Sequence, residues 1–361
     1  MPVKCGYRHK YCTYTNVMKC LNNIMRLKEY IPILLTVSFV LFPPNGVNAK
    51  VSGQCSNCHT MHNSQDGAAV VYELNSEYTG YDAVSTPKNL LLKSDCAGCH
   101  SSTSTATITG NIPIVFNTST FSDPLAAGNF SYVQDDDLKG HNVDFIQAQD
   151  ATLGRTPPGG NTMSSQLTCA GEYGCHGDRT SGKTNYTGMK GAHHTDDSGG
   201  ITGASLGLSY RFLNGILGTE DNDWEQETPV DHNQYKGSLS GATNTISYLC
   251  SRCHGDFHTW TGGASEVGTA SPWLRHPTDV DLPNSGEFAS YTTYNATAPV
   301  AQTSPGLTTD DTIVPGSDAV MCLSCHRAHS SPYYKILRWD VKSSSLATAM
   351  SGCNVCHTSK N

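Results

Sequence analysis

The stretch Cys55-Ser56-Asn57-Cys58-His59-Thr60-Met61-His62 decides the architecture of this chain. Two cysteines three positions apart, followed directly by a histidine, form the attachment signature of a c-type haem. Both sulfurs bond to the porphyrin, and the adjacent His59 ligates the iron. His62 lies one helical turn after His59 and cannot serve the opposite face of the same haem, because the porphyrin plane lies between them. Any iron that His62 ligates therefore belongs to a different haem close by.

The same signature recurs along the chain. The regular copies are Cys96-Ala97-Gly98-Cys99-His100, Cys250-Ser251-Arg252-Cys253-His254, Cys322-Leu323-Ser324-Cys325-His326 and Cys353-Asn354-Val355-Cys356-His357. The third copy in chain order is irregular and reads Cys169-Ala170-Gly171-Glu172-Tyr173-Gly174-Cys175-His176. We expect Gly171 and Gly174 to let the extra residues loop out, so that both sulfurs still reach the ring. A disulfide beside an ordinary histidine is the alternative at this motif.

All cysteines after residue 50 belong to these six motifs. The predicted haem-attachment residues are Cys55, Cys58, Cys96, Cys99, Cys169, Cys175, Cys250, Cys253, Cys322, Cys325, Cys353 and Cys356. Zinc sites are also built from paired cysteines, but zinc does not explain why a histidine follows every pair. The sequence therefore predicts six covalently attached haem c groups.

The N-terminal 49 residues have the pattern of a secretory signal peptide. An apolar run at 31–42 follows two basic residues, and Val47-Asn48-Ala49 matches a small-residue cleavage site. The run is short for a membrane span; an uncleaved anchor is the alternative. The long segment before the run also allows a true start at Met25. We expect a signal peptide at 1–49 and a single hexahaem unit at 50–361.

The charge of the predicted mature chain excludes one class of partner. Its 312 residues contain 17 Lys and Arg against 30 Asp and Glu. Nucleic-acid binders carry basic faces, so we expect no nucleic-acid partner. An acidic surface is compatible with cationic or metal-oxide partners, and equally with plain solubility.

The segments between the motifs indicate the fold class. They are rich in Gly, Ser, Thr, Asn and Asp and have few periodic apolar runs. We expect a multihaem cytochrome c that is mostly coil with short helices and few strands, organised around a continuous chain of haems. Short helices are expected at the haem motifs and around 343–350.

Counting histidines separates electron transfer from catalysis. The attachment histidines, one for each iron, are His59, His100, His176, His254, His326 and His357. Eight more histidines follow residue 50, and six are needed if every iron has two. A six-coordinate haem has no open position for a substrate. The count therefore favours an electron-transfer protein that is not an enzyme.

The second iron ligands are harder to assign. The predicted set is His62, His141, His194, His258, His276 and His329. His258 and His329 each follow an attachment histidine by three or four positions, so we expect both to ligate a neighbouring haem. The sequence leaves open which of His193 and His194 is the ligand, and His232 is the weakest candidate.

Several segments resemble the OmcS type of polymerising outer-surface cytochromes, whose hexahaem subunits stack into conducting filaments. These segments are Cys58-His59-Thr60-Met61-His62-Asn63-Ser64, Lys139-Gly140-His141-Asn142, Tyr210-Arg211-Phe212-Leu213, Leu274-Arg275-His276-Pro277, Cys322 to His329 and Cys353 to His357. The third motif departs from the family's spacing and lacks a histidine three places on. His193 or His194 is the expected substitute for that missing ligand.

The resemblance implies a function and an assembly. It implies that His62 leaves its own subunit and ligates the haem attached at Cys322 and Cys325 of the next. It further implies a secreted protein, at the cell surface or in an extracellular filament (a nanowire), which polymerises head to tail. Electrons would pass to other cytochromes and to external metal or other acceptors. The alternatives are a monomeric periplasmic electron carrier and a multihaem reductase, which would need one five-coordinate haem.

Overall fold

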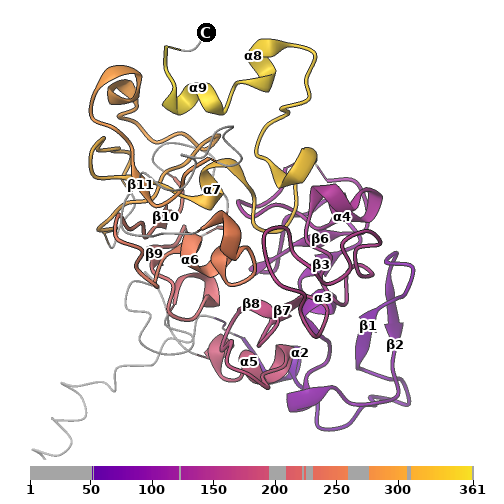
Figure 1. Cartoon of the computed structure of the whole chain (residues 1–361). Coiled ribbons are helices and arrows are strands. Elements are labelled where there is room, and N and C mark those ends of the chain that lie inside the picture. Colours follow the sequence, from indigo (N-terminus) through magenta and orange to yellow (C-terminus); the bar gives the residue numbers. More distant parts are fainter. Residues whose placement is uncertain are drawn as a thin grey trace, which may run out of the picture. The chain divides into compact units, whose positions relative to one another are not determined.

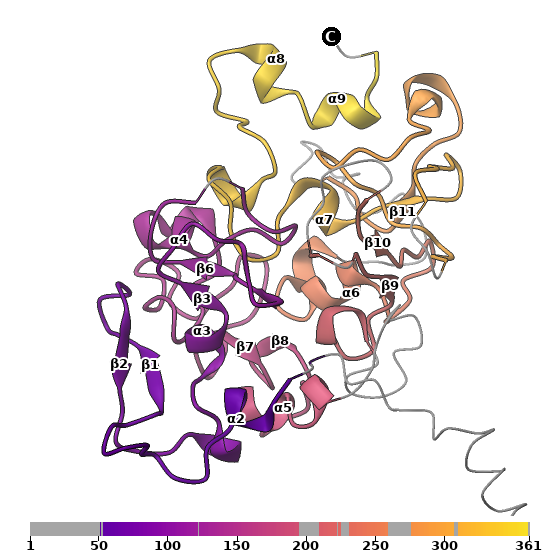
Figure 2. The same cartoon turned by 180° about the vertical axis from the view of Figure 1, so that it is seen from behind.

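The computed structural model describes residues 51, 53–121, 123–194, 209–221, 223–224, 231–258, 276–306 and 310–359. These residues form short helices and two-stranded sheets that long coil segments connect (Figure 1), as the view from behind also shows (Figure 2). The predicted fold class, mostly coil with short helices and short strands, is confirmed. The predicted signal peptide at 1–49 lies outside the described residues, as does Leu274-Arg275 of one resembling segment.

The α-helices in the described ranges are very short. They are α2 (Cys55–Cys58), α3 (Cys96–Cys99), α4 (Ser131–Asp135), α5 (Asn185–Gly188), α6 (Ile246–Ser251), α7 (Cys322–Cys325), α8 (Leu346–Ala349) and α9 (Cys353–Cys356). Four of them, α2, α3, α7 and α9, are the Cys-x-x-Cys turns themselves. In each, the amide of the following histidine donates to the carbonyl of the first cysteine, at 2.8 to 3.1 Å. Helices therefore form at haem motifs, as predicted.

Two other short helices begin at a side chain that caps their first turn. The Thr184 hydroxyl accepts from the Thr187 amide at 3.2 Å and begins α5, and the Ser345 hydroxyl caps α8 inside the predicted range 343–350. The 3-10 helices are η1 (Asn89–Leu91), η2 (Asp137–Lys139), η3 (Ala192–His194), η4 (Tyr210–Phe212), η5 (Gly255–Phe257), η6 (Gly286–Ser290) and η7 (Tyr334–Ile336).

The strands pair only two by two in the part of the chain that the structure describes. The antiparallel pairs are β1 (Tyr72–Leu74) with β2 (Tyr81–Ala83), β4 (Ile108–Thr109) with β5 (Ile112–Pro113), β9 (Gly218–Thr219) with β10 (Gln234–Tyr235), and β11 (Val280–Asp281) with β12 (Ala319–Val320). The parallel pairs are β3 (Ser101–Ser102) with β6 (Phe116–Asn117), and β7 (Thr168–Ala170) with β8 (Gly174–His176). Strands this short bury no sheet face of their own, so each pair only joins two coil segments by backbone hydrogen bonds.

Among the described residues, buried apolar side chains form three separate clusters. One contains Tyr210, Leu213, Ile216, Tyr235, Ile246, Leu249, Ala301, Met321 and Leu323. A second contains Ala97, Phe116, Phe130, Val133, Val143 and Ile146. The third contains Leu282, Tyr291, Tyr294, Val300, Ile313 and Val320. Ala97 of α3 and Leu323 of α7 belong to two of the clusters, and Val355 of α9 packs against the third. Each small cluster thus anchors a haem motif.

The described residues all fall within one compact unit, Ala49–Asn361. Within the described ranges, no helix has the length and apolar character needed to cross a membrane.

Candidate haem sites

The cysteines of the six motifs are all free thiols, at exposed or half-buried positions. In α2, α3, α7 and α9 the two cysteines begin and end a single helical turn. Cys250 lies in α6, and Cys253 follows that helix by two residues. Cysteines three positions apart on a helical turn project to one side of it. Both sulfurs of each regular motif are therefore placed to bond one porphyrin edge.

The irregular third motif reaches a similar arrangement by another route. β7 and β8 pair in parallel in a register that sets Cys169 opposite Cys175. Neighbouring strands lie about 4.8 Å apart, so the two cysteines are close despite the longer spacing. Gly171, in the connecting loop, has a φ of +82°, and a Cβ there would approach the Lys183 carbonyl oxygen to 2.5 Å. The loop thus needs this glycine, and the two sulfurs fit a single haem.

Each motif has a thiol within electrostatic range of a thiol of the next motif along the chain. The interacting thiols are Cys58 with Cys99, Cys96 with Cys169, Cys175 with Cys253, Cys250 with Cys322, and Cys325 with Cys353. The six motifs therefore adjoin one another in chain order, which is the arrangement that a continuous row of haems requires.

Two of these contacts are hydrogen bonds between thiols. The bond between Cys96 and Cys169 lowers the pKa of Cys96 and raises that of Cys169 well above its usual value. The bond between Cys250 and Cys322 likewise raises the pKa of Cys250 and lowers that of Cys322 to about 7. Thioether formation would remove the thiol protons. The pKa shifts therefore serve here only as evidence that the two thiols of each pair lie close together.

The attachment histidines are all held through Nδ1. The acceptors are the carbonyl oxygens of Leu90 for His59 (3.0 Å), Pro113 for His100 (2.9 Å), Arg211 for His176 (2.9 Å), Pro158 for His254 (2.8 Å) and Lys335 for His326 (2.9 Å), and the Glu287 carboxylate for His357 (3.0 Å). A carbonyl oxygen only accepts hydrogen bonds, so Nδ1 must carry the proton. In a neutral imidazole Nε2 then keeps its lone pair, and such outer hydrogen bonds orient metal-binding histidines. These side chains fit an iron ligand.

Three of these histidines share one backbone cradle, which the sequence did not reveal. The acceptors Leu90, Arg211 and Lys335 lie in η1, η4 and η7 with φ values of 61°, 45° and 54°. The residue after each is left-handed too, and it accepts a bond from the amide that follows the attachment histidine, as in Thr60 to Leu91 at 2.8 Å. Left-handed geometry costs a non-glycine residue about 1–2 kcal/mol. Its use at three equivalent places indicates a role in holding the histidine.

A weak sequence signal for the cradle exists. Tyr210-Arg211-Phe212-Leu213 and Tyr334-Lys335-Ile336-Leu337 share an aromatic, a basic and two apolar residues in the same order. Only the first of these segments is part of the family resemblance.

Five attachment histidines face a second histidine ring. The pairs, with the distances between ring centroids, are His59 with His194 (6.0 Å), His100 with His193 (6.3 Å), His176 with His329 (6.4 Å), His254 with His141 (6.2 Å) and His357 with His276 (6.4 Å). A metal–imidazole nitrogen bond is about 2 Å long. Two such bonds with an imidazole radius at either end separate the centroids by about 6 Å. The five pairs therefore have the spacing of two imidazoles that share one iron.

Three of the second members, His141, His193 and His329, have lowered pKa values. Burial, and then the facing His176, lower the pKa of His329 to about 3. Burial, and then the facing His254 or His100, lower the pKa of His141 and of His193 to about 4. Only a neutral imidazole binds a metal, so all three are available as ligands at neutral pH.

The pairing differs from the sequence-based expectation for two sites. Both His193 and His194 face an attachment histidine, although only one of them was expected to. The third motif was expected to draw on one of these two, but His176 faces His329 instead. His193 and His194 lie together in η3, which presents them to the first two motifs.

The fifth site is incomplete within the described chain. All histidines after residue 50 lie in the described ranges, and none of their rings faces His326 in this way. His62 is exposed, and the place opposite His59 is taken by His194. A cavity of about 400 Å³ adjoins the first motif, and its lining includes Cys55, His59 and His62.

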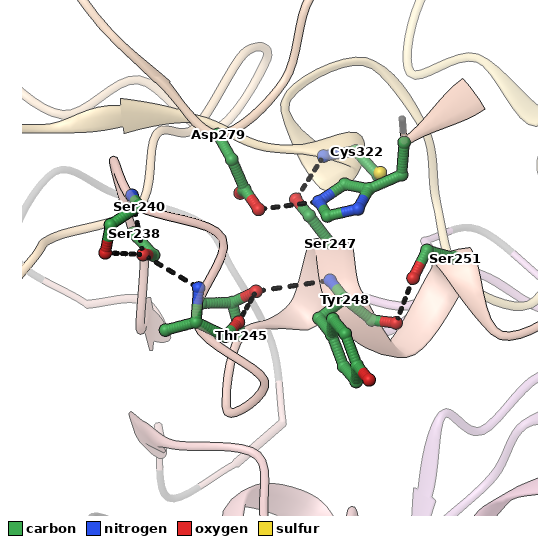
Figure 3. Close-up of polar contacts among 10 residues, drawn as sticks. Ser238, Ser240, Thr245, Ser247, Tyr248, Ser251, Asp279 and Cys322 are labelled. Atoms are coloured by element: carbon green, nitrogen blue, oxygen red, sulfur yellow. Dashed lines mark hydrogen bonds and ion pairs between the residues drawn. The ribbon is translucent and has the colours of Figure 1, made fainter. Parts of the chain in front are cut away.

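His258 does not have the geometry expected of it. Its Nε2, the nitrogen that would face an iron, lies 2.7 Å from Oδ2 of Asp279. That bond raises the pKa of His258 above its ordinary value. Figure 3 draws Asp279 together with Ser247, whose hydroxyl accepts from the Cys322 amide at 3.3 Å. The structure therefore places His258 as the partner of a buried carboxylate, not opposite an attachment histidine.

His232 also contacts protein groups and not an attachment histidine. Its ring stacks on Tyr294 with centroids 3.4 Å apart, and its two nitrogens lie 2.8 Å and 3.1 Å from the Asn233 and Asp310 carbonyl oxygens. No three His, Cys, Asp or Glu side chains of the described residues converge to hold a bare metal ion. The arrangement suits iron held by pairs of histidines within a porphyrin.

Known proteins share both the motifs and the fold. Residues 315–361 match the family described as the doubled CXXCH motif. The chain is 26% identical over 358 residues to the C-type cytochrome OmcS of Geobacter sulfurreducens, covering 80% of this chain and 79% of OmcS. Among solved structures it is similar to the Outer Membrane Cytochrome S filament from the same organism, with a TM-score of 0.50 and 19% identity over 86% of this chain and 100% of that chain. The motifs and these matches support covalently bound haem c. The predicted resemblance is confirmed: in sequence and in fold, the chain is similar to OmcS-type c-type cytochromes.

Proposed function

We propose that the chain is an exported c-type cytochrome with six covalently bound haems, whose subunits join head to tail into an extracellular filament that conducts electrons. The similar solved structure is that of a filament. The relative similar in sequence is named a c-type cytochrome. Electrons enter from other cytochromes and leave to external metal or other acceptors, and nucleic acid is not a partner.

A single observation carries the filament proposal. The fifth site, at Cys322 and Cys325, has His326 as its attachment histidine, and no other histidine of the described residues faces it. His62 is exposed and has no place at its own site. A subunit that lacks one ligand and presents one spare ligand is completed by a second copy. Because the two ends differ, the contact does not close, and it produces a filament.

The chain's own residues hold the iron ligands in place. Bound haem supplies the one-electron chemistry of iron. The five histidine pairs would each hold the iron of a bound haem from both sides, which would leave no place for a substrate and would favour transfer over catalysis. The Nδ1 acceptors fix the orientation of each attachment histidine. The order of the motifs would set the bound haems in a row along which electrons could hop.

The variant His62→Ala tests the proposal. We expect soluble subunits that keep six haems, while the haem beside His326 becomes high-spin and filaments are absent or much shorter. Intact mass counts the haems, an electronic spectrum reports the spin state, and electron microscopy reports assembly. Free imidazole should restore the low-spin spectrum of the variant without restoring filaments.

The neighbouring Met61→Ala variant is the matched control. Its side chain is 82% exposed and is not among the predicted iron ligands, so filaments and spectrum should be nearly unchanged. Normal filaments with an unaltered spectrum in His62→Ala would contradict the proposal. An altered spectrum in His62→Ala, together with no filaments from the wild-type protein, would favour a monomeric periplasmic carrier.

A further inference from the structure

The sixth attachment histidine is held differently from the other five. Those five place Nδ1 against neutral backbone carbonyl oxygens. His357 places Nδ1 3.0 Å from Oε1 of Glu287, which is a carboxylate. The two residues are 70 positions apart, so the contact is made by tertiary structure and not by local sequence.

The surrounding contacts fix the Glu287 carboxylate in this position. Glu287 lies in η6, and its side chain is only 13% exposed. The Ser359 hydroxyl donates to Oε2 at 3.1 Å, and the Thr358 hydroxyl donates to the Glu287 backbone carbonyl. The Phe288 ring meets the His357 ring edge to face, with centroids 4.9 Å apart. The segment that follows His357 thus folds back onto Glu287 and orients it.

A carboxylate changes the imidazole more than a carbonyl does. The Nδ1–H of His357 donates to a negatively charged acceptor, which draws the proton towards oxygen and raises the basicity of Nε2. A more basic axial ligand favours the oxidised iron, and outer hydrogen bonds are an established means of setting a haem potential. The negative charge of Glu287 acts in the same direction.

We propose that Glu287 is a positioning residue that tunes the potential of the site at Cys353 and Cys356, making it the lowest of the six. The inference rests on the proposed function, because it requires iron between His357 and His276. With one low-potential site in each subunit, electrons meet one energetically uphill transfer per subunit as they pass along the row. Glu287 then limits the hopping rate without contributing an iron ligand.

The test is a redox titration of the complete haem-loaded protein followed by its absorbance. Gln keeps the size of Glu287 and an acceptor oxygen but removes the charge. In Glu287→Gln we expect about one-sixth of the total absorbance change, the share of one haem, to move to higher potential. The equilibrium constant for reduction of that haem should rise tenfold or more, which corresponds to about 59 mV for one electron. Glu77→Gln, at an exposed site, removes one charge elsewhere and should leave the curve unchanged.

A second variant tests the sign. Ser359→Ala removes one hydrogen bond to the carboxylate and leaves more charge on it, so the same fraction should move to lower potential. An unchanged titration of Glu287→Gln with six low-spin haems present would overturn the inference alone. Fewer than six haems in the wild-type protein would contradict the proposed function instead, and the intact mass separates the two cases.

Discussion

The third and fifth sites hold their attachment histidines with the same left-handed backbone turn, but only the third has a second histidine ring facing the first. At the third site, His176 donates to the left-handed Arg211 and faces His329 at 6.4 Å. At the fifth site, His326 donates to the left-handed Lys335, and no histidine of the described chain faces it. The cradle that orients an attachment histidine is therefore independent of the supply of the opposite ligand.

The nearby His329 cannot complete the fifth site. It follows His326 by three positions, so, like His62, it cannot reach the far face of its own haem, and its ring lies opposite His176 of the third site. The second ligand of the fifth site must therefore come from elsewhere, and the exposed His62 of a second copy is the proposed source.

Removing His329 should make the third site resemble the fifth site of an isolated subunit. We expect His329→Ala to leave six haems, one of them high-spin, because the Ala side chain leaves one iron face open. Filaments should still form, since this ligand serves its own subunit. Electron paramagnetic resonance and electron microscopy on the same preparation measure both effects.

Methionine is the control at this position. His329→Met supplies another iron ligand, which should restore the low-spin state and raise the potential of one haem. Loss of filaments in His329→Ala with all iron still low-spin would break the comparison between the two sites.

The sequence predicted the local structure of the attachment motifs well because that structure depends on neighbouring residues alone. A Cys-x-x-Cys turn is closed by one bond from the following histidine, as in His100 to Cys96 at 2.9 Å, so the motif forms its own structure. The Gly171 loop of the third motif follows from similarly local constraints. The mostly coil fold follows from the composition of the segments between the motifs.

The ligand pairs could not be predicted because they join distant segments. His141 faces His254, and nothing in the spacing of either residue indicates the other. His258 and His329 look alike in sequence, each closely following an attachment histidine. The structure separates them, because a buried carboxylate at Asp279 lies within hydrogen-bonding distance of His258.

Replacing His258 should therefore change stability but not the iron. The bond to Asp279 raises the pKa of His258 in the folded chain. A raised pKa stabilises the fold fully below the unfolded value of about 6.5, and this contribution disappears as pH rises through the folded pKa. We expect His258→Gln to reduce the fall in thermal midpoint that the wild type shows above about pH 6.5.

The spectrum provides the contrast with His329→Ala. Gln still donates a hydrogen bond to Asp279, and all haems should remain low-spin. A high-spin signal in His258→Gln would show that His258 is an iron ligand after all, and it would restore the interpretation based on spacing.

The smallest expected effect concerns the cradle that the third and fifth sites share. Lys335 is exposed and has a φ of 54°, so its side chain contributes little packing while its Cβ is strained. Glycine has no such strain, and left-handed geometry costs other residues about 1–2 kcal/mol. Lys335→Gly should therefore be more stable than the control Lys335→Ala by about 1 kcal/mol in thermal unfolding, since both lack the lysine side chain and only Ala keeps the Cβ. Equal stability of the two variants would mean that the turn carries no strain, and its repetition at three sites would then need another explanation.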